Sequence, residues 1–123
     1  MADVLTFCRD MMFTSKVREV ARQLGVTVAP VKTPAAFAEP SGSPEVGPET
    51  RLVILDLRLP EALTLLGALK GNALHKSLKT VGFIDHERTD VMDEARARGC
   101  DEVFAKGGFA TALPRLLAKE VIS

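Results

Sequence analysis

The sequence contains little cysteine: Cys8 and Cys100 are the only two among 123 residues. They are far apart and form no C-x-x-C pair, which argues against a disulfide framework and against a zinc site. No apolar run approaches the roughly 18 residues that a membrane span requires. The N-terminus also lacks the basic flank and long apolar stretch of a signal peptide. We therefore expect a cytoplasmic protein with no membrane partner.

The sequence has no excess of charge of either sign, because 16 basic and 16 acidic residues give a formal net charge of zero. Nucleic-acid binding by bulk electrostatics usually needs a clear basic excess, so we expect no nucleic-acid partner. The chain is 46% hydrophobic and 26% charged, as globular domains are. Its 123 residues fit a single domain. The segment 39–50, rich in Pro, Gly, Ser and Glu, predicts a flexible surface loop within it.

Hydrophobic patterning predicts strands and helices in alternation. Short apolar or β-branched runs predict strands at 3–8, 26–30, 52–56, 80–84 and 102–105. Between and after them the pattern predicts helices at 13–24, 61–70, 89–98 and 111–121, with one or two helical turns at 33–38. Pro114 then falls in the first turn of the last helix, where proline is tolerated. Five strand–helix units predict an α/β fold with a parallel sheet covered by helices on both faces.

Polar side chains gather where these predicted strands end. Ligand sites of open parallel sheets lie outside the carboxyl ends of the strands, so these residues are the candidates for a site. Asp56 is the residue we expect to be its centre, because it directly follows the most apolar strand of the chain. The other candidates at this edge are Cys8, Arg9, Asp10, Asp85, His86 and Lys106.

Two segments carry a resemblance to a known family. The stretch L-V-I-L-D-L-R-L-P, which contains Asp56, is similar to the phospho-acceptor segment of response-regulator receiver domains: a buried strand, an Asp, three residues and a Pro. The stretch G-C-D-E-V-F-A-K, ending at Lys106, resembles the family's A-G-A-D-D-Y-L-V-K. The resemblance covers nearly the whole chain. It implies a CheY-like domain, with a flavodoxin-like (βα)5 doubly wound sheet in strand order 2-1-3-4-5.

The resemblance also implies roles and partners. Asp56 falls on the residue that accepts a phosphoryl group from a histidine kinase, and Lys106 falls on the Lys that contacts this group. A Mg²⁺ ion would be held by Asp10 and Asp56, since a metal and a Lys must offset the repulsion between carboxylate and phosphate. The chain would be no enzyme beyond self-phosphotransfer to Asp56. The family's fourth helix, fifth strand and fifth helix commonly form a homodimer or partner face, so we expect a kinase or downstream signalling protein as partner.

Several residues depart from the family's pattern. After the first strand the family has an acidic pair, whereas this chain has Cys8 and Arg9, with Asp10 one place later. After the fourth strand the family's Ser or Thr is absent, and Asp85 and His86 follow the strand instead. These departures indicate a pseudo-receiver that keeps the fold and the Asp, signals through protein–protein interaction, and has impaired phosphorylation and no cofactor. The alternative within the class is an active, Mg²⁺-dependent phospho-acceptor.

Some side chains leave more than one interpretation open. Arg9 either pairs with Asp56 in place of a metal or pairs with a surface carboxylate. Cys8 is either a small buried side chain or a thiolate whose pKa a neighbouring cation lowers. Asp85 and His86 are adjacent, as an acid–base pair would be, while His75 lies in a polar segment and is expected to be solvated.

An alternative of another class is a small flavodoxin-like protein that binds a nucleotide or a flavin. The pair Gly107-Gly108 after the last predicted strand would then approach an anion at a helix start. Neither G-x-G-x-x-G nor G-x-x-x-x-G-K-[ST] occurs in the sequence, which argues against this alternative.

Overall fold

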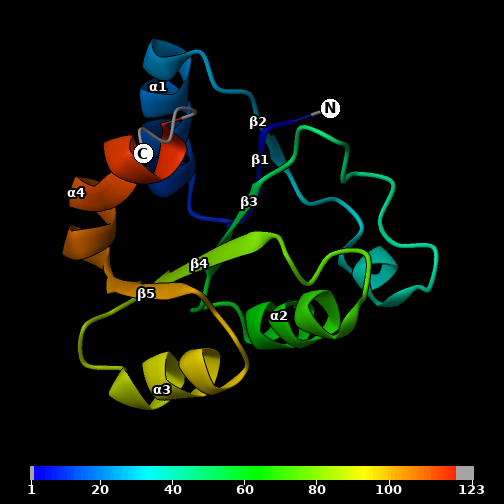
Figure 1. Ribbon diagram of the computed structural model, residues 1–123. Helices are drawn as coiled ribbons and strands as arrows, with labels where there is room; N and C mark the ends of the chain where they lie inside the picture. Colours follow the sequence, from blue (N-terminus) through cyan, green and yellow to red (C-terminus); the bar gives the residue numbers. More distant parts are fainter. Residues whose placement is uncertain (1, 119–123) are drawn as a thin grey trace.

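A computed structural model describes residues 2–118. Its five parallel strands form one sheet in the order β2-β1-β3-β4-β5, which confirms the predicted fold class and strand order (Figure 1). The strands are β1 (Val4–Phe7), β2 (Val28–Pro30), β3 (Leu52–Asp56), β4 (Lys79–Ile84) and β5 (Glu102–Ala105). The helices are α1 (Met11–Leu24), α2 (Pro60–Gly71), α3 (Thr89–Ala97) and α4 (Lys106–Leu117), with a 3-10 helix, η1 (Pro34–Ala38).

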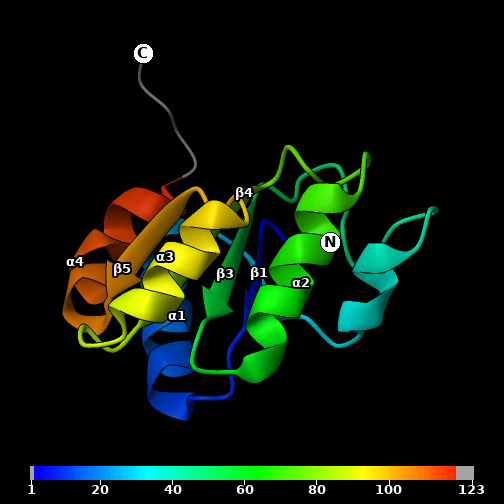
Figure 2. The same cartoon turned by 90° about the horizontal axis from the view of Figure 1, so that it is seen from below.

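The helices cover both faces of the sheet. Helices α1 and α4 lie side by side on one face, and α2 and α3 cover the other (Figures 1 and 2). Each face has its own buried apolar cluster. Strand β3 contributes alternate residues to both clusters, and all five of its residues are buried. A central parallel strand covered on two faces explains why the run L-V-I-L is apolar at every position.

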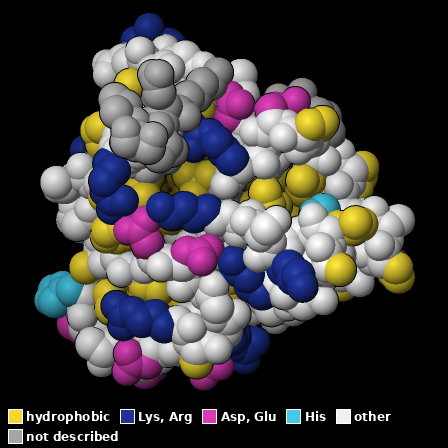
Figure 3. Space-filling model, viewed as in Figure 1, with side chains coloured by type: hydrophobic (Ala, Val, Ile, Leu, Met, Phe, Trp, Pro, Cys, Tyr) yellow, Lys and Arg dark blue, Asp and Glu magenta, His cyan; other side chains and the backbone are white. Residues whose placement is uncertain are grey.

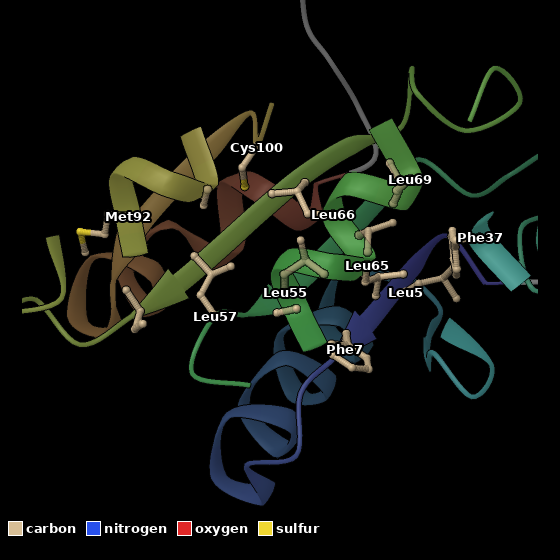
Figure 4. Packing of buried hydrophobic residues seen from close by; sticks show 14 of the residues in the cluster. Leu5, Phe7, Phe37, Leu55, Leu57, Leu65, Leu66, Leu69, Met92 and Cys100 are labelled. Carbon is tan, nitrogen blue, oxygen red and sulfur yellow. The ribbon is translucent and has the colours of Figure 1, made fainter. Parts of the chain in front are cut away.

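One cluster is shown from close by in Figure 4. Leu5 of β1 and Leu55 of β3 lie on the side of the sheet that meets α2, where Leu65, Leu66 and Leu69 are buried. Full burial of each such leucine stabilises the fold by about 1.5–3 kcal/mol relative to an exposed one. This packing fixes the carboxyl end of β3, and with it the position of Asp56.

The second strand–helix unit differs from a full (βα)5 pattern, because η1 has only five residues. Pro34 can begin a helix, but the prolines and glycines after Ala38 favour turns and loops. The following segment, expected to be flexible, has fixed contacts: Glu45 accepts the backbone N–H groups of Lys32 and Thr33 at 2.8 and 3.0 Å. Its mobility in solution stays a prediction.

His75 is buried, with 4% of its surface exposed, so the expectation of a solvated side chain is wrong. Its Nε2 accepts the backbone N–H of Ser43 at 2.9 Å, and its ring packs against Phe37. The segment around His75 is polar in sequence, but it folds over η1 and the loop that follows, and this contact between distant segments buries the ring.

Helix α4 begins at Lys106, five residues earlier than the predicted Thr111. Gly107 and Gly108 are poor helix formers and favoured a loop in the sequence. The burial of Phe109 on the helix outweighs this local preference. Pro114 therefore lies inside the helix and not in its first turn, and the prediction for it is wrong. The predicted end at residue 121 lies outside the described residues.

The surface carries both signs of charge. On the face shown in Figure 3, Lys and Arg side chains lie among Asp and Glu side chains, as the balanced composition implies. None of the helices at residues 2–118 is both long enough and apolar enough to cross a membrane.

Candidate functional site

Asp56 ends β3 at the carboxyl edge of the sheet, where it pairs in register with Phe83 of β4. Its neighbour on the other side is β1, whose last residue, Phe7, pairs with Leu55. Only 2% of the surface of Asp56 is exposed. A buried carboxylate is stable only when it is hydrogen-bonded and its charge is compensated, so its partners decide what this site is.

The charge partner of Asp56 is Arg58. The guanidinium Nε donates to Asp56 Oδ1 at 2.9 Å, and Nη2 donates to Asp56 Oδ2 at 2.9 Å, so the two groups form a two-point contact. The backbone N–H of Arg58 donates to the same Oδ1 at 3.1 Å. Both carboxylate oxygens are therefore engaged by one residue that lies two positions further along the chain. Such bidentate pairs are the strong form of the Arg–carboxylate contact.

Asp10 supplies a second carboxylate to the same guanidinium. Arg58 Nη2 donates to Asp10 Oδ2 at 3.0 Å, while Asp10 Oδ1 caps helix α1 by accepting the backbone N–H groups of Met12 and Phe13. The hydrogen bond from Arg58, with those from the helix, holds the pKa of Asp10 below its usual value. Asp10 thus connects the start of α1 to the end of β3 through Arg58.

The guanidinium lies over aromatic rings. Its central carbon is 5.7 Å from the ring centre of Phe13 and 5.8 Å from that of Phe83, and these two rings stack at 4.7 Å. Cation–π contacts of this kind favour a cation by about 0.5–2 kcal/mol. The hydrogen bond to Asp56 is the largest cause of a pKa of Arg58 above its ordinary value, so the side chain stays charged.

Arg9 does not reach Asp56, so the first of its two sequence interpretations is wrong and the second is correct. Arg9 Nη2 pairs with Oε2 of Glu61 at 3.5 Å, and both side chains are at least half exposed. The chain turns at Asp10 into helix α1, which leaves Arg9 on the outer surface. A cation does pair with Asp56, but a different arginine supplies it.

One feature of the sequence indicates a cation beside Asp56 other than Arg9: the position of Arg58. It is the R of L-R-L-P, two residues after Asp56, so its side chain begins close to the carboxylate. The resemblance to the family rests on the Asp and the Pro, and Arg58 lies between these two matched residues. A cation at this position was therefore present in the motif, yet nothing local in the sequence says which way its side chain turns.

Lys106 is the first residue of α4, and its Nζ is 3.3 Å from Oδ1 of Asp85. The same Nζ lies 5.7 Å from the centre of the Phe13 ring. The structure therefore brings Lys106 and Asp85 together at this edge. His86 does not join Asp85: its Nδ1 is 2.9 Å from Oε2 of Glu87, and its side chain is 83% exposed. The adjacency of Asp85 and His86 in sequence thus forms no acid–base pair.

Cys8 lies beside the Asp56 carboxylate, with its Sγ 3.6 Å from Oδ2. Burial is the largest cause of a raised pKa of the Cys8 thiol, and the negative charge of Asp56 raises it further. The alternative of a thiolate whose pKa a neighbouring cation lowers is therefore wrong, because the charge that acts on the Cys8 thiol is that of the Asp56 carboxylate. Cys8 contributes a neutral S–H donor to Asp56.

Comparisons with known proteins show the fold. No family model and no curated protein sequence matches the chain. The Mn²⁺-bound form of the response regulator Rcp1 is 17% identical in sequence and has a TM-score of 0.74. The superposition with it covers 100% of this chain and 99% of the Rcp1 chain. The phosphorylated cyanobacterial phytochrome response regulator RcpA is 15% identical, with 94% and 88% covered and a TM-score of 0.73.

A third similar structure is the Mg²⁺-bound receiver domain of the sensor histidine kinase PA1611 from Pseudomonas aeruginosa. It is 14% identical, with 94% of this chain and 93% of that chain covered, and has a TM-score of 0.70. The resemblance inferred from the sequence is thus confirmed at the level of the fold. The chain has the α/β fold of CheY-like response-regulator receiver domains.

The side chains at the carboxyl edge do not fit a divalent cation. Mg²⁺ prefers near-octahedral coordination by oxygen atoms at about 2.0–2.1 Å. Here both oxygens of Asp56 and one oxygen of Asp10 accept hydrogen bonds from Arg58, and the other oxygen of Asp10 caps a helix. No group of three or more acidic, histidine or cysteine residues within 2–118 is arranged to hold a metal ion.

Proposed function

We propose that this chain is a receiver-like signalling domain that acts through protein–protein contacts and in which phosphorylation of Asp56 is impaired. One observation carries the proposal: both oxygens of the buried Asp56 carboxylate are bonded to Arg58. To accept a phosphoryl group, a carboxylate oxygen must approach the phosphorus atom along a free direction. In this site that approach requires the two-point contact with Arg58 to open first.

The surroundings of Asp56 support the proposal. Lys106, which falls on the family's phosphoryl-contacting Lys, is close to the carboxylate of Asp85. Ile84, at the end of β4, is buried and offers no hydroxyl group to a phosphoryl oxygen. A negative charge and an apolar side chain thus stand near the place where an anionic group would have to be stabilised.

The partners remain a proposal as well. A histidine kinase or a downstream signalling protein is the class of partner that the fold suggests. The face formed by α3, β5 and α4 is the candidate surface, for a partner or for a second copy. Near this face, Glu102 of β5 pairs with Arg115 of α4 and with Lys79 of β4. Both cations lower the pKa of Glu102, and the hydrogen bond from Arg115 is the larger cause.

The experiment is phosphoryl transfer in the presence of Mg²⁺. The purified protein is incubated with acetyl phosphate, and its intact mass is measured over time beside that of an active receiver domain. We expect no gain of a phosphoryl group on the time scale on which the active domain is modified. Stoichiometric modification that disappears in Asp56→Asn would contradict the proposal and favour the active, Mg²⁺-dependent phospho-acceptor.

A further inference from the structure

We infer that Arg58 is a built-in cation that takes the place of a divalent metal ion and fixes the two carboxylates of Asp10 and Asp56 to each other. The inference rests on the proposed function, because it explains physically why Asp56 is not free. It goes further by assigning the role of the cation to one residue and by predicting that the site does not respond to divalent ions.

Every carboxylate oxygen of Asp10 and Asp56 has a hydrogen-bond donor without an added ion, and Arg58 offsets one of the two negative charges. Arg58 Nη2 carries two hydrogen atoms, and its two acceptors are Asp10 Oδ2 at 3.0 Å and Asp56 Oδ2 at 2.9 Å. Its Nε donates to the remaining oxygen of Asp56. A single nitrogen therefore bridges carboxylates from two chain segments that are far apart in the sequence. This bridging of two acidic side chains is what a divalent cation would otherwise supply.

Two further contacts hold Arg58 at this site, one with aromatic rings and one through its own backbone. The guanidinium lies over the rings of Phe13 and Phe83. Phe83 belongs to the buried cluster on the α1 and α4 side of the sheet, and Phe13 is partly buried and packs against this cluster. The backbone N–H of Arg58 donates a hydrogen bond to Asp56 Oδ1, so the Arg58 side chain leaves the backbone close to the carboxylate. A tethered cation pays no cost of association from solution, and a dissolved ion would have to displace it.

Because Arg58 is part of the chain, the connection that it makes between Asp10 and Asp56 does not depend on a dissolved ion. Asp10 caps the start of α1 and Asp56 ends β3, so Arg58 connects the first strand–helix junction to the third. In a site that needs a dissolved ion, this connection would depend on the ion's concentration. With Arg58 in place, the edge of the sheet keeps one arrangement whether or not divalent ions are present.

The test measures the response to divalent ions in four proteins: the wild type, Arg58→Ala, Arg58→Lys and, as a matched control, Arg9→Ala. Arg9 is one residue from Asp10 but pairs with the exposed Glu61, so removing it leaves the bridge intact. The melting temperature is recorded with and without millimolar Mg²⁺. Mn²⁺ is then added to labelled protein, and paramagnetic broadening of amide signals near Asp56 is followed by NMR.

In the wild type and in Arg9→Ala we expect no Mg²⁺-dependent rise in melting temperature and no Mn²⁺ broadening centred on Asp56. In Arg58→Ala we expect a lower melting temperature that Mg²⁺ partly restores, because two carboxylates are then left without a cation. Arg58→Lys keeps a positive charge, so it is expected to melt between the two and to stay insensitive to Mg²⁺. It keeps the inference testable if the alanine variant does not fold.

Specific Mn²⁺ broadening around Asp56 in the wild type would overturn the inference. So would an Arg58→Ala protein that is as stable as the wild type and equally insensitive to Mg²⁺. These outcomes are separate from the phosphorylation test. A wild type that binds Mn²⁺ but takes up no phosphoryl group would refute the role of Arg58 as the cation and leave the proposed function standing.

Discussion

Replacing Arg58 by alanine should destabilise the domain through Asp56. Breaking a fully buried ion pair typically costs about 3–5 kcal/mol, because one charge is left without a partner. Asp56 is 2% exposed, but the Arg58 side chain is 27% exposed, so water can enter the space that it leaves. Any residue at position 58 also keeps the backbone hydrogen bond to Oδ1. We therefore expect a loss of about 2–3 kcal/mol, at or below the lower limit of that range.

The assay is urea unfolding followed by far-ultraviolet circular dichroism, run as a double-mutant cycle with Asp56→Asn. For a domain of this size the expected loss corresponds to a fall of about 8–12 °C in melting temperature. In the Asp56→Asn background the same removal of Arg58 should cost about 1 kcal/mol or less, because the buried charge is already gone. Equal costs in the two backgrounds would refute the assignment of Arg58 as the partner of Asp56.

Three further predictions concern Asp10, His75 and Cys8. The folded pKa of Asp10 is lowered, so its contribution to stability is present above the unfolded pKa of about 3.9 and is lost as the pH falls through the folded pKa. The variant Asp10→Asn keeps a helix cap but loses the charge contact with Arg58. The difference in free energy of unfolding between the wild type and this variant should therefore shrink below about pH 4, as measured by urea titrations. His75→Phe leaves the buried backbone N–H of Ser43 without its acceptor and should lower the free energy of unfolding by about 1–2 kcal/mol, measured by the same assay. Because burial raises the pKa of the Cys8 thiol, iodoacetamide should alkylate it more slowly than free cysteine at neutral pH, as followed by peptide mass spectrometry; faster reaction would contradict the placement beside Asp56.

The sequence was sufficient for the sheet and for the position of Asp56. The apolar run before Asp56 favours a strand buried on both faces, and the alternation of strands and helices then favours a parallel sheet. Both expectations depend on periodicity, which is a local property of the chain. The structure of β3 and the strand order confirm them.

The partner of Asp56 was not predictable in the same way. Arg9 and Arg58 both begin within a few residues of the carboxyl edge, and the sequence assigns neither of them a direction. The choice between them depends on Phe13 and Phe83, which come from α1 and β4 and form the surface under the guanidinium only after the sheet has assembled. His75 illustrates the same limit, because its burial is created by contacts with residues more than 30 positions away.

The most direct measurement is an experimental structure of the protein crystallised with Mg²⁺ and beryllofluoride, which forms a phosphoryl-like group on receptive carboxylates. We predict that the Arg58 guanidinium will occupy both oxygens of Asp56 and reach Asp10, with no metal ion and no beryllofluoride at the carboxylate. Density for an octahedral cation between Asp10 and Asp56, with Arg58 turned into solvent, would contradict the assignment of Arg58 as the cation of this site.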